Sequence, residues 1–137
     1  MLLALADDEV RQGRTWRLSL PDIATLRGRP LALRRGLANL FDNAARHGAA
    51  PFEAELIADG DDWRITVRDR GPGVPDTALG ALGRPFHRVD RARGVSGSGL
   101  GLASVARVAA LHGGGLQLRN RAGDGFEAVL RLRIRPA

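Results

Sequence analysis

The chain of 137 residues has no cysteine and no lysine, and only 4% of its residues are aromatic. The lack of cysteine excludes a disulfide framework and a thiolate metal site, and the three histidines share no ligand spacing that would predict zinc. The net charge of +6 comes from 21 arginines set against 15 acidic residues. These arginines are scattered and lack interleaved aromatic residues, so we expect no nucleic-acid partner.

Long apolar runs are also missing. No stretch approaches the roughly 18 apolar residues that a membrane-spanning helix needs, and the N-terminus lacks the basic segment of a signal peptide. We therefore expect a cytoplasmic domain that makes no membrane contact itself. A length of 137 residues with 44% apolar content is typical of one globular domain with its own core.

Hydrophobic periodicity predicts strands, hairpins and two helices. Helical spacing covers residues 31–47 and again 101–113, where glycines end the second pattern. Period-two alternation indicates strands at 15–20, over a hairpin at 52–69, and over a final hairpin built from 116–121 and 126–134. Weaker patterns predict a short strand at 23–28, a short helix at 77–82 and a surface loop at 83–98.

This order of elements predicts an α/β fold of the α+β two-layer sandwich type, with a mixed, mostly antiparallel sheet covered on one face by helices. Arg64, Thr66 and Arg68 alternate within one predicted strand and should lie on the outer face of the sheet. His112 is expected at the end of the second helix, and His87 on the surface of the loop.

The predicted helix over 31–47 has an apolar face and a polar face. The apolar stripe consists of Leu33, Leu37, Leu40, Phe41 and Ala44. Asn39, Asn43, Arg46 and His47 fall together on another face. Two asparagines one turn apart offer amide oxygens to Mg²⁺, which keeps most of its waters and bridges phosphates. The alternative is a simple solvated face.

Two glycine-rich segments suit a ligand with phosphates and a ring. "GVSGSGLGLASV" (94–105) puts bare backbone N–H groups before a helix, where the helix dipole attracts an anion, although a linker or a tight helix contact would explain the glycines as well. In "DRGPGV" (69–74), an aspartate that ends a strand can accept a hydrogen bond from an exocyclic amine. An ordinary turn is the alternative here.

Four segments, taken in order, resemble a known family. "NLFDNAARHG", "DRGPGV", "PFHRVD" and "GSGLGL" resemble the N, G1, F and G2 boxes of the catalytic ATP-binding domain of sensor histidine kinases, within the gyrase-like ATPase superfamily. The resemblance runs from Thr15 to Ile134 and implies the Bergerat ATP-binding fold. It implies a catalytic domain over residues 15–137, preceded by a tail, residues 1–14, that resembles the end of a dimerisation-domain helix.

The resemblance implies a role for each matching residue. Asn43 corresponds to the Mg²⁺ ligand, with Asn39 assisting, Arg46 contacts the phosphates and His47 packs near the nucleotide. Asp69 receives the adenine amino group, and Gly71 and Gly73 make room for the base. The remaining nucleotide-binding positions are Val74, Phe86, Gly97, Ser98, Gly99, Leu100, Gly101 and Leu102, with Arg88 joining Asn39, Asn43 and Arg46 in the catalytic set.

The residue at position 39 bears on the reaction. ATP-hydrolysing relatives and anti-sigma-factor kinases carry a glutamate there, whereas an amide cannot accept a proton from water. The resemblance therefore implies that Mg-ATP donates its γ-phosphoryl group to a histidine on a separate dimerisation domain, in a two-component pathway with a response regulator. An anti-sigma-factor-type serine kinase and a degenerate nucleotide-binding scaffold are the alternatives. We expect a monomer when isolated, and a parent kinase anchored in the inner membrane.

Overall fold

The structure, a computed structural model, describes residues 13–21, 26, 28–73 and 100–134. Within them lie one five-stranded sheet and two helices. In chain order the elements are β1 (Trp16–Ser19), α2 (Pro30–His47), β2 (Phe52–Asp59), β3 (Asp62–Asp69), α5 (Leu100–Leu111), β4 (Gly115–Asn120) and β5 (Phe126–Arg133).

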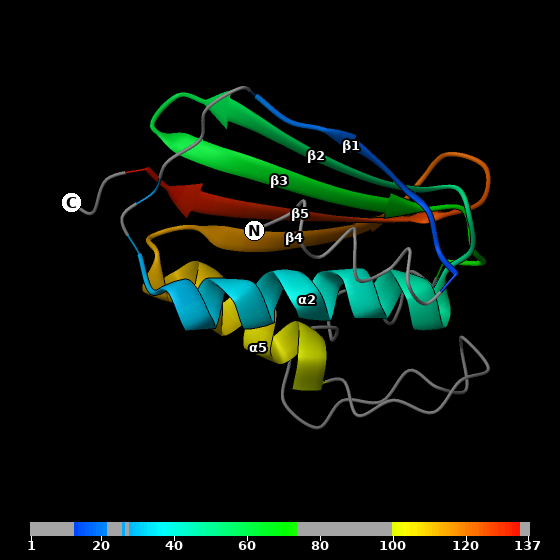
Figure 1. The fold of residues 1–137 in the computed structure, drawn as a ribbon, viewed down its shortest axis with the longest axis horizontal. Helices are drawn as coiled ribbons and strands as arrows, with labels where there is room; N and C mark the ends of the chain where they lie inside the picture. Colours follow the sequence, from blue (N-terminus) through cyan, green and yellow to red (C-terminus); the bar gives the residue numbers. More distant parts are fainter. Residues whose placement is uncertain (1–12, 22–25, 27, 74–99, 135–137) are drawn as a thin grey trace.

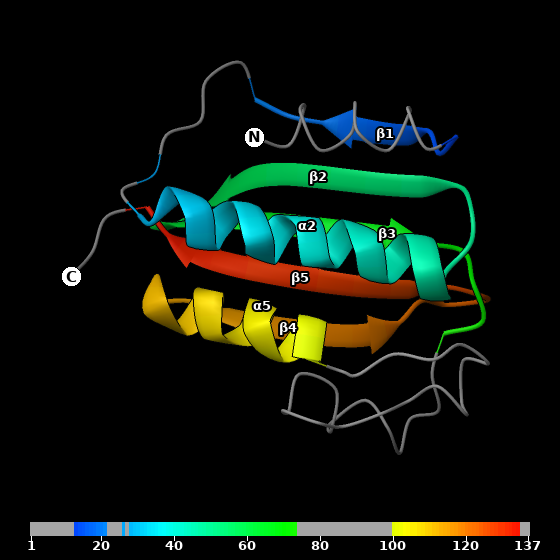
Figure 2. The ribbon, with the colours of Figure 1, turned by 60° about the horizontal axis from the view of Figure 1, so that its bottom comes forward.

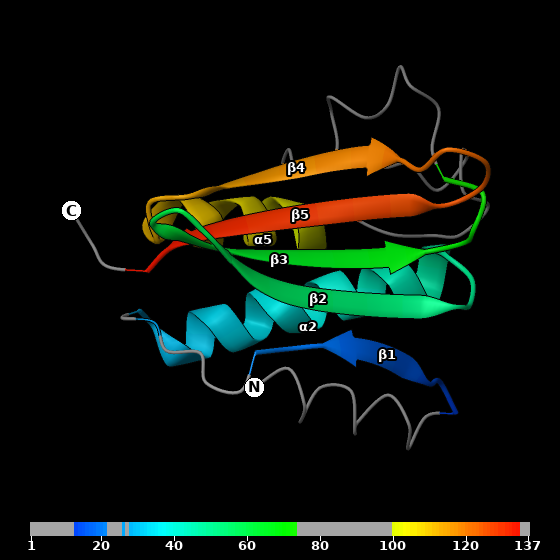
Figure 3. The same cartoon turned by 90° about the horizontal axis from the view of Figure 1, so that it is seen from above.

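The sheet is mixed and mostly antiparallel, as the sequence predicted. Its strands lie in the order β1-β2-β3-β5-β4, so the last strand in the sequence sits between β3 and β4. β1 runs parallel to β2, and the other neighbouring strands pair antiparallel. Both helices cover the same face of this sheet, α2 over its middle and α5 beside the β4 edge (Figures 1 and 2). The opposite face is open in Figure 3, where the strands lie in front of both helices.

The sequence of the long helix α2 explains where the helix begins and ends. Pro30 occupies the first turn, where its missing N–H has no helical partner in any case. Arg46 and His47 fall in the last turn, where positive charge is favourable beside the helix carboxyl end. The predicted apolar stripe is confirmed, because all five of its residues are buried: Leu33, Leu37, Leu40, Phe41 and Ala44.

A stack of three aromatic rings joins β1 to the rest of the core. The Trp16 ring lies 4.1 Å from that of Phe41 on α2 and 5.2 Å from that of Phe52 on β2, centroid to centroid. Stacked rings of this size bury large apolar areas. Strand β1, at the edge of the sheet, is therefore held by the Trp16 side chain as well as by its backbone pairing with β2.

His112, which directly follows α5, ties the two helices together at the end where α2 begins. It is at the helix terminus, as predicted, but it is 8% exposed. Its Nδ1 lies 2.8 Å from the Val108 carbonyl oxygen, and its Nε2 accepts a hydrogen bond from the Arg29 backbone N–H at 3.0 Å. The ring thus acts as a structural link between two helix ends.

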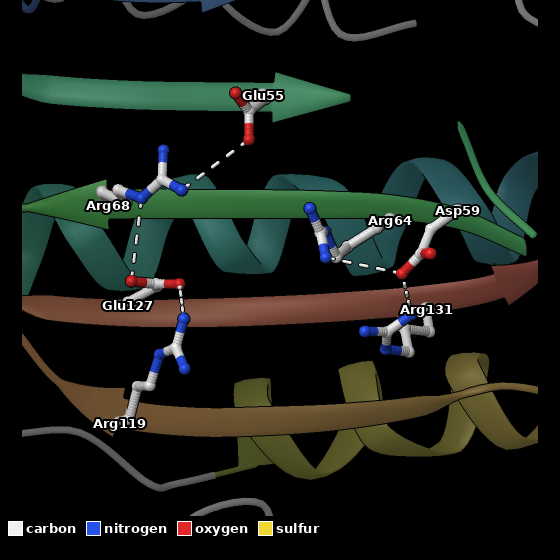
Figure 4. A network of polar contacts seen from close by, with 7 residues as sticks. All are labelled: Glu55, Asp59, Arg64, Arg68, Arg119, Glu127 and Arg131. Atoms are coloured by element: carbon white, nitrogen blue, oxygen red, sulfur yellow. Dashed lines mark hydrogen bonds and ion pairs between the residues drawn. The ribbon is translucent and has the colours of Figure 1, made fainter. Parts of the chain in front are cut away.

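The outer face of the sheet carries alternating charges in ion pairs (Figure 4). Arg68 lies between Glu55 and Glu127, at 3.7 Å from an oxygen of each, and Arg119 also pairs with Glu127 at 2.7 Å. A second group is centred on one acid of β2, and its members are Asp59, Arg64 and Arg131. The predicted outward positions of Arg64, Thr66 and Arg68 are confirmed, because Ile65 and Val67, which alternate with them in β3, are buried in the core; Thr66 is nevertheless only 2% exposed.

Both hairpins and both helices are confirmed to within two residues of their predicted limits. The predicted helix at 77–82 and loop at 83–98 lie outside the described residues. Of the predicted strand at 23–28, only Leu26 and Gly28 are described, and neither belongs to a strand.

Candidate functional site

Three parts of the chain meet at one end of the molecule: the carboxyl end of α2, the end of β3 and the turn between β4 and β5 (Figure 1). The start of α5 lies beside the middle of α2, where Gly101 contacts Asn39 (Figure 2). Of the segments that contain predicted site residues, the end of α2 and the end of β3 therefore lie together, although they come from different parts of the chain.

Asp69 is the centre of this region. It is the last residue of β3, and its alternation with the outward-facing Arg68 places its side chain on the helix-covered face. The residue is 1% exposed, and its Oδ1 accepts a hydrogen bond from the Gly71 backbone N–H at 2.8 Å. A carboxylate is kept at such depth only where donors satisfy it, so this one is held in a defined orientation.

The backbone of two glycines surrounds the Asp69 carboxylate. A Cβ on Gly48, which caps α2, would lie 2.2 Å from the Asp69 Cγ, and a Cβ on Gly71 would lie 2.6 Å from the Gly48 Cα. The Arg70 N–H also donates to the Ala49 carbonyl at 2.8 Å. The glycine at position 71 is thus required by contact with the helix end, and its role in making room for a base stays a prediction.

The polar face of α2 lies beside the start of α5. Asn39 and Asn43 are both half-buried. The Asn39 side-chain amide donates to the Gly101 carbonyl oxygen at 3.5 Å, a long hydrogen bond that joins the two helices. Gly101 itself is exposed, whereas Leu102 is 5% exposed and belongs to the core.

Arg46 and His47 complete this face of α2. Arg46 is exposed and pairs with Asp42 one turn earlier, with its Nε 3.0 Å from the carboxylate. An exposed pair of this kind contributes little to stability and releases its arginine readily to another anion. His47 is half-buried at the last position of the helix.

The remaining predicted positions cannot be placed in this site. Six of them lie outside the described residues: Val74, Phe86, Arg88, Gly97, Ser98 and Gly99. Of Leu100, only its place as the first residue of α5 is described.

Gly73, by contrast, is described. It has a φ of +71°, and a Cβ there would lie 2.5 Å from the Asn120 Oδ1.

Sequence reasoning missed three residues that hold Asp69: Gly48, Arg70 and Arg121. Gly48 follows a helix and Arg121 precedes a turn, which are common local patterns. Their contacts are with a strand end from another part of the chain, so no local spacing reveals them. A side chain of either arginine would ordinarily be assigned to solvent.

In residues 13–21, 26, 28–73 and 100–134, no three His, Asp or Glu side chains are grouped so that they could hold a metal ion. In the same ranges, no helix is both long and apolar enough to cross a membrane.

Known proteins resemble this chain in both sequence and fold. The family model described as "Histidine kinase-, DNA gyrase B-, and HSP90-like ATPase" matches residues 28–136. Sensor protein QseC of Salmonella typhi is 41% identical over 104 residues, which are 76% of this chain and 22% of that protein. The match thus spans about a fifth of the length of this relative.

Two solved structures show the same arrangement of sheet and helices. The mycobacterial sensor histidine kinase MprB has a TM-score of 0.78 at 27% identity, covering 99% of this chain and 97% of its own. Full-length ShkA, in complex with AMPPNP, has a TM-score of 0.77 at 27% identity, covering 98% of this chain and 29% of its own.

The predicted α/β sandwich of the Bergerat type is confirmed by these neighbours, and the family match covers most of the described residues. The chain therefore belongs to the family of histidine kinase-, DNA gyrase B- and HSP90-like ATPases, and it matches the catalytic ATP-binding domain of sensor histidine kinases.

Proposed function

We propose that this domain binds Mg-ATP and donates the γ-phosphoryl group to a histidine on a separate dimerisation domain. The observation that supports this best is the buried carboxylate of Asp69, held at a strand end beside a Gly-Xaa-Gly turn in a member of this ATPase family. A carboxylate at the floor of a site can distinguish adenine from guanine, because only adenine offers an exocyclic amine at that position.

The asparagine face of α2 is suited to the phosphate end of the nucleotide. Asn43 offers an amide oxygen to Mg²⁺, and Asn39 supports it from the preceding turn. The described residues fit this ion, since it usually binds through one or two protein oxygens together with water and phosphates. Arg46 would exchange its exposed partner Asp42 for a phosphate oxygen. The predicted site residues Phe86, Arg88 and 97–99 belong to this proposal as well.

An amide at position 39 favours transfer over hydrolysis. Asn39 donates its amide N–H to the Gly101 carbonyl, so it helps to join the helices and has no basic group to activate water. In the transfer step, a histidine nitrogen forms a bond to the γ-phosphorus while the bond to the β-phosphate oxygen breaks and ADP leaves. Arg46 would offset the negative charge of the transferred group, and a bound Mg²⁺ would add positive charge there.

The partners follow from this reaction. The acceptor is a histidine-bearing dimerisation domain, and a response regulator receives the phosphoryl group in turn. We propose a domain limit at residue 15, just before β1 begins at Trp16, with residues 1–14 as a tail that is the end of a dimerisation-domain helix.

Calorimetric titration tests the nucleotide site. We expect a non-hydrolysable ATP analogue to bind tightly with Mg²⁺ and weakly with EDTA, and GTP to bind weakly throughout. Asn43→Ala should remove the Mg²⁺ dependence and raise the Kd at least about tenfold, because a metal ligand is lost. Arg35→Ala, which truncates an exposed side chain on the same helix, is the matched control and should change nothing.

A second measurement separates transfer from binding alone. With radiolabelled ATP and the dimerisation domain of a related sensor kinase, the label should reach the acceptor in an acid-labile, base-stable form. Analogue binding by Asn43→Ala that stays as tight and as dependent on Mg²⁺ as in the unaltered protein contradicts the metal assignment. Tight binding without transfer supports the scaffold alternative, and rapid steady-state ATP hydrolysis contradicts the argument from Asn39.

A further inference from the structure

The turn between β4 and β5 lies against the backbone that carries Asp69. Arg121, the first residue after β4, is half-buried, and its Nη1 donates to the Asp69 carbonyl oxygen at 3.0 Å. The same residue closes the turn through its own backbone, since the Arg121 N–H donates to the Gly125 carbonyl at 3.0 Å. The arginine therefore connects a fixed turn to the last peptide of β3.

A second arginine makes the reverse connection. Arg70 follows Asp69 and reaches across to the turn, where its Nη1 donates to the Asp124 carbonyl at 3.0 Å and to the Ala122 carbonyl at 3.5 Å. Each segment thus supplies a guanidinium group to the carbonyl oxygens of the other. Hydrogen bonds from a charged donor are stronger than those between neutral groups.

The two backbones also touch where no side chain could fit. Gly125 has a φ of +133°, and a Cβ there would lie 2.4 Å from the Asp69 carbonyl oxygen. A Cβ on Gly73 would lie 3.2 Å from the Gly125 carbonyl oxygen. The turn therefore packs directly on the segment 69–73, and the two arginines fasten the contact at both sides.

We infer that Arg121 and Arg70 are positioning residues, which fix the peptide of Asp69 so that its carboxylate is oriented before a nucleotide base arrives. The Arg121 guanidinium group holds the Asp69 carbonyl oxygen. The Arg70 guanidinium group holds the carbonyl oxygens of the turn that precedes β5. The carboxylate is oriented separately by the Gly71 N–H. Rigid placement of an acceptor raises affinity by removing the cost of ordering it on binding. The inference rests on the proposed function, because it assumes that Asp69 meets adenine.

The variant that tests the inference is Arg121→Met, which keeps most of the side-chain volume and removes the donor. Arg119→Met is the matched control, since Arg119 lies two residues earlier on β4 and pairs with Glu127 on the outer face. We expect Arg121→Met to raise the Kd of the ATP analogue about tenfold, as the loss of one charged hydrogen bond suggests. The preference for ATP over GTP should fall by a similar factor, while Arg119→Met should leave both within about twofold.

Nuclear magnetic resonance of the nucleotide-free protein gives a second, independent readout. The Gly71 amide reports the hydrogen bond to the Asp69 carboxylate, so its chemical shift should move in Arg121→Met and stay in place in Arg119→Met. A purely structural role would lower the melting temperature of Arg121→Met without moving the ATP preference. That result, or an unmoved Gly71 amide, would overturn the inference.

Asp69→Asn separates this inference from the function on which it rests. If Asp69→Asn binds ATP and GTP as the unaltered protein does, the proposed adenine contact is wrong. If Asp69→Asn loses the preference for ATP and Arg121→Met keeps it, the adenine contact stands and the positioning role is refuted.

Discussion

At the scale of single residues, the candidate site depends on the absence of side chains as much as on their presence. The Asp69 carboxylate fills the space where a Cβ on Gly48 would lie, and Gly48 has an ordinary extended backbone with φ −101° and ψ −162°. Its glycine is therefore demanded by packing alone. Overpacking of a filled space typically costs 1–3 kcal/mol, because neighbouring groups must move.

Gly48→Ala tests this dependence. We expect it to lower the free energy of unfolding by about 2 kcal/mol and to weaken binding of the ATP analogue, because the new methyl group displaces the Asp69 carboxylate. Urea denaturation and calorimetry measure the two effects. Gly115→Ala is the control, since a Cβ there would have nothing within 4 Å. Equal stability and affinity in the two variants would contradict the contact.

At the scale of elements, the sheet has one face for the core and one for charge. On the outer face, Asp59 of β2 accepts a hydrogen bond from Arg131 of β5 at 2.7 Å, and Arg64 of β3 lies 3.4 Å from the same oxygen (Figure 4). The hydrogen bond from Arg131, followed by the charges of Arg131 and Arg64, lowers the pKa of Asp59 below its usual value of 3.8. Folding thus favours the ionised form.

The lowered pKa of Asp59 makes the stability of the folded protein depend on pH. A carboxylate with a lowered pKa stabilises the folded state above its unfolded pKa of 3.8, and this contribution is lost as the pH falls through the lower folded value. We expect the stability difference between the unaltered protein and Asp59→Asn to be present at about pH 6 and to shrink below about pH 3.5. Added salt should reduce it at the higher pH, because the group is exposed.

Denaturation in urea across this pH range measures the difference. Asp61→Asn changes an exposed acid in the same hairpin turn and serves as the control. A difference for Asp59→Asn that grows as the pH falls below 3.8 would show that the sign is wrong.

At the scale of the whole molecule, the described surface gives little reason for self-association. The large hydrophobic residues that are exposed in the described ranges are Leu31 and Leu111, and the outer sheet face carries charges that pair with one another. Stable interfaces need larger apolar areas or unpaired complementary charges. We expect the isolated chain to be a monomer of 14.6 kDa by light scattering at micromolar concentration, and a concentration-dependent dimer would contradict this.

Much of the fold could be predicted from the sequence because its patterns are local. Period-two alternation gave both hairpins, and the stripe from Leu33 to Ala44 gave the core face of α2. The position of β5 between β3 and β4 could not be predicted, because pairing of strands that are distant in sequence leaves no local signal. The same holds for the hydrogen bond between Arg29 and His112, which joins residues 83 positions apart.

For the same reason, some residues of the candidate site could be proposed from the sequence and others could not. Asp69 and the asparagine face could be proposed because their residue types and spacing suit a nucleotide and Mg²⁺, with an ordinary turn and a solvated face as the alternatives, and the family resemblance assigned their roles. The contacts around Asp69, from Gly48, Arg70 and Arg121, depend on how the end of β3 meets the helix end and the last turn. Such contacts are settled by tertiary packing.

The inner position of β5 has a consequence for the order in which the protein can be made. Until residues 126–133 have left the ribosome, β3 has a free edge and β4 has no neighbour on that side. The buried residues of β5, among them Phe126 and Leu130, also complete the core under both helices. The sheet must therefore close late in the synthesis of this domain, and a nascent chain interrupted before Phe126 exposes an unpaired strand to its neighbours on the same messenger RNA.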